Sequence, residues 1–284
     1  SGSILIFGPG TYKCQQTITI PDHPTVQKQL KYLTLQGSAK LPKNIKINAT
    51  TLLYTGHDPL TLTPFIDFRG GTRNKRFIGS IRNMSFRGDN KNIVGLWFYE
   101  CVGSLFDDVY VERCKCGIQI DSYYYYCKFN RVQCVYCDYG LKAEGSANKA
   151  SFYCCQFSSN LTAGFAGNLN NTGNASAHFY GCYFEGNGTA IEANLNSYME
   201  INNCYFEKNT KYILSISCPN IDYCTPLVVF NNSFIGLLGS ELSLNKSVIK
   251  QVANCDNIVS YDISNNIIAN QWTEDYDYFI YVGS

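Results

Sequence analysis

A repeated six-residue segment constrains the fold of this chain more than any other feature of its sequence. The segment begins with a large apolar residue, has a small or apolar residue at its fourth position, and ends on another apolar residue. Six clear copies start at residues 106, 129, 152, 179, 201 and 230, which are 22 to 29 residues apart, and weaker copies start at residues 81 and 263. A period of this length indicates a solenoid, in which each repeat buries its apolar side only by stacking on its neighbours.

Aligning the copies gives three apolar columns, with polar or amphipathic residues between them. The first column is Phe106, Phe129, Phe152, Phe179, Ile201 and Phe230; the second is Met84, Val109, Val132, Cys155, Cys182, Cys204 and Ser233; the third is Phe86, Val111, Cys134, Phe157, Phe184, Phe206 and Ile235. This alternation with one interruption predicts two short strands that meet at a bend, and neighbouring coils should lie about 4.8 Å apart.

A turn and a third strand follow in each copy. The position eight residues after the first apolar column is occupied by Cys114, Cys137, Asn160, Asn187 and Asn209. Stacked asparagines at a tight turn can bond their own backbone and their neighbours, so we predict an asparagine ladder. The third strand should point Leu96, Ile118, Leu141, Phe165, Ile191 and Ile213 inward. The connection to the next coil varies most in length and is rich in Asn and Gly between Gly167 and Ala177.

The repeat therefore predicts an all-β fold, a single right-handed parallel β-helix with three strands per coil. We expect one β-helix domain over residues 1–284, with irregular coils over 1–75, regular coils over 76–240, and further coils or a cap over 241–284. The sequence shows no signal peptide and opens directly on a strand-like segment, so we expect it to be a fragment of a longer chain or a processed product.

Charge and hydropathy exclude several classes of partner. The formal net charge is only +1, which argues against nucleic-acid binding, because that requires a basic stripe, and against a polybasic membrane anchor. No apolar run approaches the roughly 20 residues of a membrane-spanning helix, so we expect no membrane insertion.

The 14 cysteines fit no zinc-binding spacing, and we expect neither a metal site nor a cofactor. Cysteine in the second column is interpreted as a small buried hydrophobe stacked on its equals, with redox or metal chemistry as the alternative. Cys114 and Cys137 fall on adjacent coils, where a disulfide is compatible with the pattern but not required by it.

Several segments carry a family resemblance. The segments GSILIFGPGTY (Gly2–Tyr12), TITIP (Thr17–Pro21) and LTLQG (Leu33–Gly37) resemble the first coils of the pectate-lyase-like family. The segments GCYFEGN (Gly181–Asn187) and NCYFEKN (Asn203–Asn209) resemble the same family in the style of virus and phage tailspikes. The resemblance covers the chain to about residue 270. It implies a polysaccharide partner, a homotrimer, and a place on the virion surface or outside the cell, and it places the family's short capping helix upstream.

The family's catalytic motifs are mostly missing. Polygalacturonase-like enzymes carry Asn-Thr-Asp, Asp-Asp and Gly-His-Gly motifs. Of these, only the Asp-Asp motif has a counterpart in this sequence, Asp107-Asp108. No match to the Arg base and calcium-binding aspartates of pectate lyases is found. This argues against both enzyme types, whereas tailspikes share no common catalytic motif.

Glycoside hydrolysis uses two carboxyl groups, about 5–5.5 Å apart for retention of configuration and about 6.5–9.5 Å apart for inversion. Asp121 and Glu144 end adjacent third strands at equivalent outward positions and form the first candidate catalytic pair. Asp107 and Asp108 are the second, although strand alternation would point them apart unless the bend intervenes. Glu185 and Glu207 also stack, but they belong to the repeat and are interpreted as structural.

Two groups of residues are candidates for substrate binding. Lys128, His178 and Glu200 share one outward column of the first strand, and Tyr180 lies in the next outward column. We interpret this strip either as a saccharide-binding surface or as an ordinary solvated sheet face. Aromatic rings stack on the apolar faces of sugars, so Trp97, Tyr99, Tyr123 and Tyr125 are candidate platforms, the alternative being surface tiling or subunit contacts.

Three hypotheses of function follow. The first is a tailspike shaft that binds a polysaccharide, with or without cleaving it as a hydrolase or lyase. The second is a secreted cellular enzyme of the pectate-lyase-like type. The third is a non-catalytic adhesin or structural spike.

Overall fold

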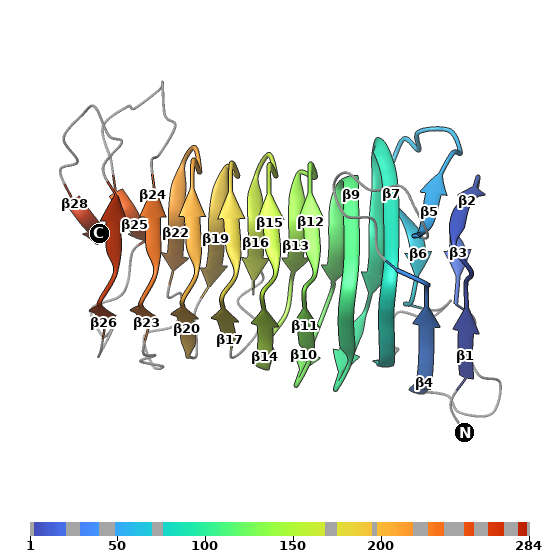
Figure 1. Ribbon diagram of the computed structural model, residues 1–284, viewed down its shortest axis with the longest axis horizontal. Coiled ribbons are helices and arrows are strands. Elements are labelled where there is room, and N and C mark those ends of the chain that lie inside the picture. Colours follow the sequence, from blue (N-terminus) through green and yellow to red (C-terminus); the bar gives the residue numbers. More distant parts are fainter. Residues whose placement is uncertain are drawn as a thin grey trace.

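The computed structural model describes residues 3–20, 29–39, 49–69, 76–167, 175–194, 198–217, 227–235, 247–252, 261–269 and 278–282. These residues form 28 strands, and all their pairings are parallel. The strands wind into the predicted right-handed parallel β-helix, with the N-terminus at one end of the long axis and the last strands at the other (Figure 1). No helix of membrane-spanning length and hydropathy occurs among the described residues.

Two long strands pass through all three faces of the helix. They are β7 (Arg76–Phe98) and β9 (Leu105–Ile120), and they pair with each other along most of their length. Each therefore makes nearly a whole coil. Shorter strands of the neighbouring coils pair with its first, middle and last segments, one in each sheet.

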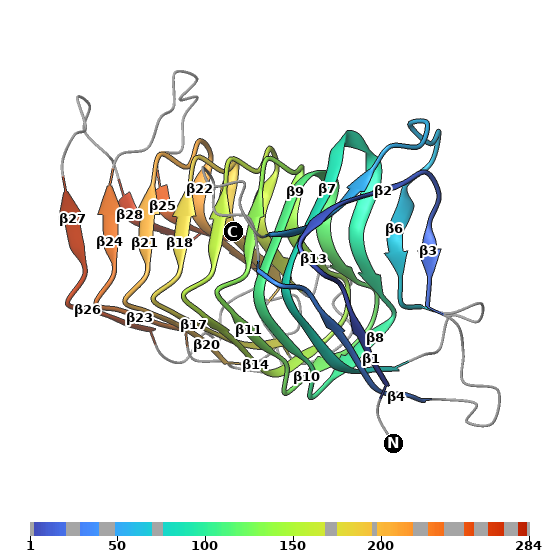
Figure 2. The ribbon, with the colours of Figure 1, turned by 45° about the vertical axis from the view of Figure 1, so that its right-hand side comes forward.

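The remaining strands stack into three parallel sheets, and Figure 2 separates their faces. The first sheet contains β1 (Ser3–Ile6), β4 (Gln29–Gln36), β8 (Glu100–Val102), β10 (Tyr124–Tyr125), β11 (Lys128–Asn130), β14 (Ala147–Tyr153), β17 (Ala175–Tyr180), β20 (Met199–Asn202), β23 (Leu227–Phe230) and β26 (Tyr261–Ser264). The second sheet contains β2 (Gly10–Cys14), β5 (Thr50–Tyr54), β12 (Gln133–Val135), β15 (Gln156–Ser158), β18 (Tyr183–Glu185), β21 (Tyr205–Glu207), β24 (Ser233–Ile235) and β27 (Ile267–Ala269). The third sheet contains β3 (Ile18–Thr19), β6 (Thr63–Asp67), β13 (Tyr139–Ala143), β16 (Ala163–Gly167), β19 (Thr189–Asn194), β22 (Tyr212–Ser217), β25 (Ser247–Val252) and β28 (Tyr278–Val282).

Left-handed residues turn the chain between sheets. The bend between the first and second sheets has φ of 49° to 60° at Asn83, Asp108, Arg131, Cys154, Gly181, Asn203, Asn231 and Asn265. The bend between the second and third sheets has φ of 52° to 64° at Arg113, Tyr136, Ser159, Gly186 and Lys208. Asn, Asp and Gly tolerate this conformation best, which explains why the first bend is rich in them.

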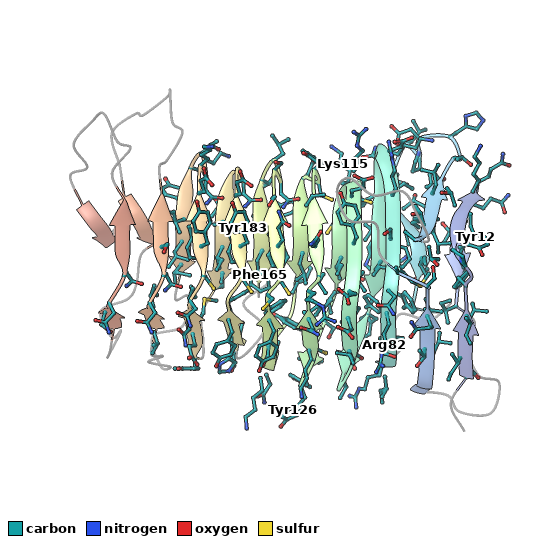
Figure 3. All side chains as sticks on the ribbon, in the orientation of Figure 1. Tyr12, Arg82, Lys115, Tyr126, Phe165 and Tyr183 are labelled. Carbon is teal, nitrogen blue, oxygen red and sulfur yellow. The ribbon has the colours of Figure 1, made fainter. Side chains whose placement is uncertain are left out.

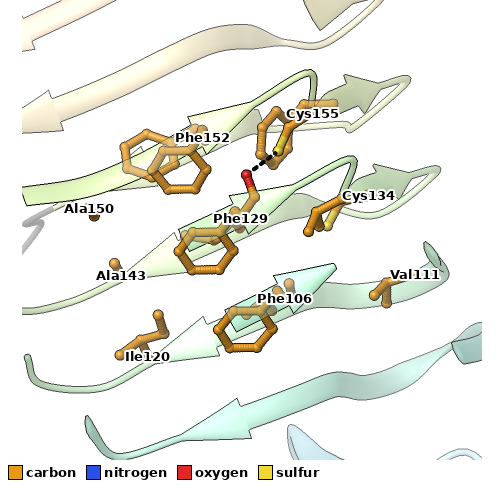
Figure 4. Close-up of a cluster of buried hydrophobic side chains, with 14 of the residues drawn as sticks. Phe106, Val111, Ile120, Phe129, Cys134, Ala143, Ala150, Phe152 and Cys155 are labelled. Atoms are coloured by element: carbon orange, nitrogen blue, oxygen red, sulfur yellow. Dashed lines mark hydrogen bonds between the residues drawn. The ribbon is translucent and has the colours of Figure 1, made fainter. Parts of the chain in front are cut away.

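The interior is a column of stacked rings, as the first apolar column predicts. Phe129 lies 4.6 Å from Phe106 and 4.5 Å from Phe152 between ring centroids, with interplanar angles of 5° and 9°. Figure 4 shows these rings in line, with Cys134 and Cys155 beside them. Burial of such rings removes a large apolar area from water and dominates the stability of the coils.

The predicted asparagine ladder is present at the second bend. The side-chain Oδ1 of Asn187 accepts from the backbone N and Nδ2 of Asn160 at 3.1 and 2.9 Å. Asn187 in turn donates from Nδ2 to Asn209 Oδ1 at 3.0 Å and to the carbonyl of Phe157 at 2.9 Å. Because a bend interrupts sheet pairing, these side chains satisfy backbone groups that would otherwise be buried without partners.

The cysteines of the second apolar column likewise satisfy backbone groups, at the first bend. The thiols of Cys155 and Cys182 each donate to a carbonyl of the preceding coil, at 3.3 Å. Farther along the axis, Asn232 and Asn266 take over this column, and their Nδ2 atoms donate to Ile201 and Val229 carbonyls at 2.9 Å. Burial raises the pKa of the Cys182 thiol, so the structure supports the interpretation of these cysteines as inert packing residues. Cys114 and Cys137 are free thiols.

The predicted register is wrong by one residue at two places. Ile201 pairs with Val229 rather than Phe230, so that Asn232 and Phe234 replace Ser233 and Ile235 in the other two columns. Ile191 pairs with Leu214 rather than Ile213. In both places consecutive apolar residues leave the alternation ambiguous, and at the first place the hydrogen bond from Cys204 N to Asn232 Oδ1 decides the register.

Candidate functional site

The first-sheet strip is assembled as the sequence predicts. Lys128, Ser151, His178 and Glu200 are consecutive register partners on β11, β14, β17 and β20. Around Glu200 the strip forms a polar cluster, because its Oε2 accepts from Tyr180 Oη at 2.8 Å and lies 3.3 Å from His178 Nδ1. Burial, reinforced by this hydrogen bond to Glu200, raises the pKa of Tyr180, so its hydroxyl stays protonated at neutral pH.

Asp107 and Asp108 lie on the same side of the chain because the bend intervenes. Asp108 has a φ of 52°, which breaks the alternation after Asp107. Arg131 from the next coil binds both carboxylates, with Nη2 at 2.8 Å from each, and Asn130 donates to Asp107 at 2.7 Å. The pair therefore forms an ion-paired cross-coil contact at the bend.

Asp121 and Glu144 follow paired third-sheet strands, as predicted, and both have partners there. Trp97 Nε1 and Gln119 Nε2 donate to Asp121 Oδ1 at 2.7 and 2.9 Å. Glu144 forms an ion pair with Lys142. The two carboxylates thus lie on consecutive coils, each held by neighbours on its own face.

The four candidate aromatic platforms differ in what covers them. The guanidinium of Arg69 lies 3.8 Å above the Trp97 ring, so one face of that ring is occupied. Tyr123 and Tyr125 stack on each other with centroids 5.2 Å apart. Tyr99 precedes Glu100 at the turn into β8, and its carbonyl accepts from the backbone N of Ser122 at 2.8 Å. These residues gather at the turn between the third and first sheets.

A hollow that the sequence predictions did not identify lies elsewhere, on the second sheet. It is a groove of about 400 Å³ lined by Tyr110, Gln133, Val135, Tyr136, Gln156, Ser158, Ser159, Glu185, Gly186, Lys208 and Thr210. These residues come from five successive coils, so the groove runs along the axis for about 19 Å at the spacing of parallel strands. A smaller hollow of about 180 Å³ lies on the third sheet beside Lys115, Gln119 and Lys142.

Outward columns of the second sheet form the floor of the groove. Tyr110, Gln133 and Gln156 are register partners on β9, β12 and β15, and the same column continues into Tyr183 and Tyr205. The last two rings stack with centroids 4.7 Å apart and an angle of 5°. In Figure 3, Tyr183 lies on this face, whereas Tyr126 lies at the opposite lower edge of the molecule. The second bend forms the rim, and its left-handed residues Tyr136, Ser159, Gly186 and Lys208 all line the groove.

Charged groups cluster at one end of the groove. Lys208 Nζ lies 2.9 Å from Glu207 Oε1, and Tyr205 Oη donates to Glu207 Oε2 at 3.0 Å. The hydrogen bond from Lys208 lowers the pKa of Glu207. Burial raises the pKa of Tyr183, which donates to the same Glu207 oxygen at 3.3 Å. The groove therefore offers ring faces, amides, hydroxyls and a fixed charge pair along one line.

No short motif identifies this groove in the sequence. Its lining residues are neighbours of the apolar columns and of the second bend, and they are spread over five repeats. A comparison of outward columns, such as Tyr110 with Gln133 and Gln156, is the signal that could have found it.

Comparison with solved structures shows a likeness of fold to a viral protein. No model of a known protein family matches this chain, and no curated protein sequence matches it. Among solved structures, ORF18 of Geobacillus virus E2 is similar, with a TM-score of 0.56 and 17% identity over 98% of this chain and 54% of ORF18. The chain thus spans about half the length of ORF18. The A-module of mannuronan C-5 epimerase AlgE4 from Azotobacter vinelandii gives a TM-score of 0.46 and 12% identity over 100% of this chain and 91% of the module. At such identities the likeness to ORF18 is a likeness of fold.

Proposed function

We propose that this protein binds an extended polysaccharide in the second-sheet groove. The supporting observation is the shape of the groove together with its lining. It is long, follows the helix axis, and exposes the same kinds of polar group on successive coils. A linear polymer with repeated hydroxyls matches such a surface better than a compact ligand does, because each coil presents a similar contact about 4.8 Å farther along.

The chemistry of the lining suits sugars. Tyr136 supplies an exposed ring that can pack on apolar sugar faces, and Gln133 and Gln156 supply amides that both donate and accept hydrogen bonds. Burial raises the pKa of Tyr110, so its hydroxyl remains a donor, here to Glu112 at 3.1 Å. A neutral or weakly charged polysaccharide is the preferred ligand class, because Glu185 and Lys208 contribute opposite charges to the lining.

A matched pair of tyrosines tests the proposal. Tyr136 lines the groove and is 45% exposed, with a φ of 56°; Tyr126 is 56% exposed, with a φ of 55°, and lies outside the groove. Native electrophoresis through gels that contain dextran, polygalacturonate or a bacterial capsular polysaccharide should retard the wild-type protein in at least one gel. Tyr136→Ala should weaken that retardation about tenfold, whereas Tyr126→Ala should not change it. Equal retardation of both variants would contradict the proposal.

The biological setting is part of the same proposal. We assign the chain to the β-helical shaft of a tail spike of the pectate-lyase-like type, homotrimeric and located on a virion surface. The tailspike-like segments Gly181–Asn187 and Asn203–Asn209 and the fold shared with a viral protein support this assignment. Light scattering of the purified protein should give three times the mass of one chain, and a monomer would favour the secreted-enzyme alternative.

Depolymerisation is the second candidate function, with Asp121 and Glu144 as its carboxyl pair. Their position at the ends of paired strands on consecutive coils favours it, because coils about 4.8 Å apart bring two carboxyl groups into the same region, as glycosidases require. New reducing ends, released by the wild-type protein and absent with Asp121→Asn, would support hydrolysis. Unsaturated sugars detected by absorbance would indicate a lyase instead.

A further inference from the structure

Three side chains of the first sheet form a relay that saccharide binding does not require. Ser176 Oγ lies 3.4 Å from His178 Nε2, and His178 Nδ1 lies 3.3 Å from Glu200 Oε2. Hydroxyl, imidazole and carboxylate therefore follow one another in the order of a serine hydrolase triad, which is recognised by geometry and roles rather than by sequence motif.

Strand geometry produces this order. Ser176 and His178 are two residues apart on β17, so their side chains project from the same face. His178 and Glu200 are register partners on β17 and β20, so the carboxylate is beside the imidazole on the next coil. The inward neighbours Ala177 and Phe179 are buried and fix the strand that carries the first two groups.

A hydrogen bond from His178 Nδ1 to Glu200 selects the imidazole tautomer in which Nε2 faces Ser176 as an acceptor. Tyr180 and Tyr198 donate to Glu200 Oε2 at 2.8 and 3.3 Å, so this oxygen already accepts hydrogen bonds on the side of the carboxylate that faces the cluster. When His178 donates its Nδ1 proton to the same oxygen, Nε2 has a free lone pair for the Ser176 hydroxyl. The side chains of His178 and Glu200 are 19% and 16% exposed, whereas Ser176 is 9% exposed, so the cluster reaches the surface mainly through its imidazole and carboxylate.

We propose that Ser176, His178 and Glu200 form an esterase site, with Ser176 as the nucleophile, His178 as the general base and Glu200 as the residue that positions the imidazole. The substrate class is a carboxylic ester of a sugar hydroxyl, an O-acyl group on the bound polysaccharide. That identification of the substrate rests on the proposed polysaccharide-binding function, whereas the esterase chemistry does not.

The reaction balances with water as the only co-reactant. Ser176 Oγ attacks the ester carbonyl carbon while its proton passes to His178 Nε2. The carbon–oxygen bond to the sugar breaks, and His178 returns the proton to the departing hydroxyl. Water then attacks the acylated Ser176 and gives its proton to His178. The acid leaves, and the serine hydroxyl is restored.

Two small probes test the site without any polysaccharide. The wild-type protein should hydrolyse 4-nitrophenyl acetate, and diisopropyl fluorophosphate should modify Ser176 and stop the reaction, with the modified residue located by peptide mass spectrometry. Ser176→Ala and His178→Phe should each lower kcat/KM at least about a hundredfold. Ser215→Ala is the control, because Ser215 is a half-buried serine on β22 of the third sheet, and it should keep the wild-type rate.

The role of Glu200 as a positioning residue predicts a separate signature. Glu200→Gln should lower kcat while KM for 4-nitrophenyl acetate stays within about twofold, and Glu200→Asp should recover part of kcat. Modification of a residue other than Ser176, or equal rates for Ser176→Ala and Ser215→Ala, would overturn the proposal. Loss of polysaccharide retardation in Tyr136→Ala with full esterase activity would show that the two sites work independently. Esterase activity without any polysaccharide binding would reject the proposed function and the substrate class while leaving the triad in place.

Discussion

The asparagine ladder gives the sharpest prediction of stability, and Asn187→Ala tests it at the centre of the ladder. Asn187 is fully buried and connects three coils through its side chain. Truncation to Ala leaves the backbone N–H of Asn160 and one Nδ2 hydrogen of Asn160 without their acceptor, and removes a donor from the carbonyl of Phe157.

The loss of stability follows from the number of buried polar groups that are left without a hydrogen-bond partner. A buried polar group left without a partner costs about 1–3 kcal/mol, so the two donors of Asn160 alone should lower the free energy of unfolding by about 4 kcal/mol. That is a large part of the roughly 5–15 kcal/mol that stabilises an ordinary domain. Asn148 on β14 is exposed, and Asn148→Ala should change the free energy by less than about 0.5 kcal/mol.

Equilibrium unfolding in urea, followed by both tyrosine fluorescence and far-ultraviolet circular dichroism, measures the difference between the two variants. Hydrogen exchange should in addition be faster at the Asn160 amide in Asn187→Ala, since that amide loses its acceptor. If Asn187→Ala unfolds within about 1 kcal/mol of Asn148→Ala, then water replaces the side chain at little cost, and the ladder is not what stabilises the second bend.

Three further predictions address the core, the charge pair and the thiols. Phe152→Ala should lower the free energy of unfolding by about 3–5 kcal/mol in the same urea assay, because it opens a cavity in the ring stack. The hydrogen bond from Lys208 lowers the pKa of Glu207 in the folded state, so the stability that Glu207 contributes is present above its unfolded pKa of about 4.3 and is lost as pH falls through the lower folded value. Wild type should therefore exceed Glu207→Gln in stability at pH 7 and lose this advantage in acid, as measured by unfolding at a series of pH values; an advantage that persists unchanged at pH 2 would refute the assignment. Iodoacetamide should modify exposed Cys154 in the native protein and spare buried Cys155. Fragment-ion mass spectrometry of the peptide that contains both cysteines locates the modification, and modification of Cys155 in place of Cys154 would contradict the prediction.

The fold could be predicted from the sequence because a solenoid repeats its constraints. Each coil must place a large apolar residue at the position of Phe129 and a bend residue two positions after it, so errors in one copy are corrected by the others. The register failed at Phe230 and Ile213, where two adjacent apolar residues satisfy the pattern equally well. There the pairing depends on contacts across coils, such as the bond from Cys204 N to Asn232 Oδ1 at 2.7 Å, which a single repeat does not reveal.

The candidate sites were less accessible to sequence reasoning, for two physical reasons. The groove is formed by outward side chains from five coils together with left-handed bend residues, and alternation alone predicts neither its depth nor its rim. Ser176 lies in the variable Asn- and Gly-rich connection after Gly167, and the structure extends β17 back to Ala175, which places Ser176 on a strand. By contrast, the column of Lys128, His178 and Glu200 follows directly from the repeat and was predicted.

Hydroxyl-radical footprinting with and without a polysaccharide that retards the protein tests the central claim most directly, because tyrosines report on every face. Binding in the second-sheet groove predicts that oxidation of Tyr136 falls severalfold while Tyr126, Tyr123 and Tyr180 keep their rates. Protection of Tyr123 or Tyr180 with no change at Tyr136 would place the polysaccharide on another face and contradict the account.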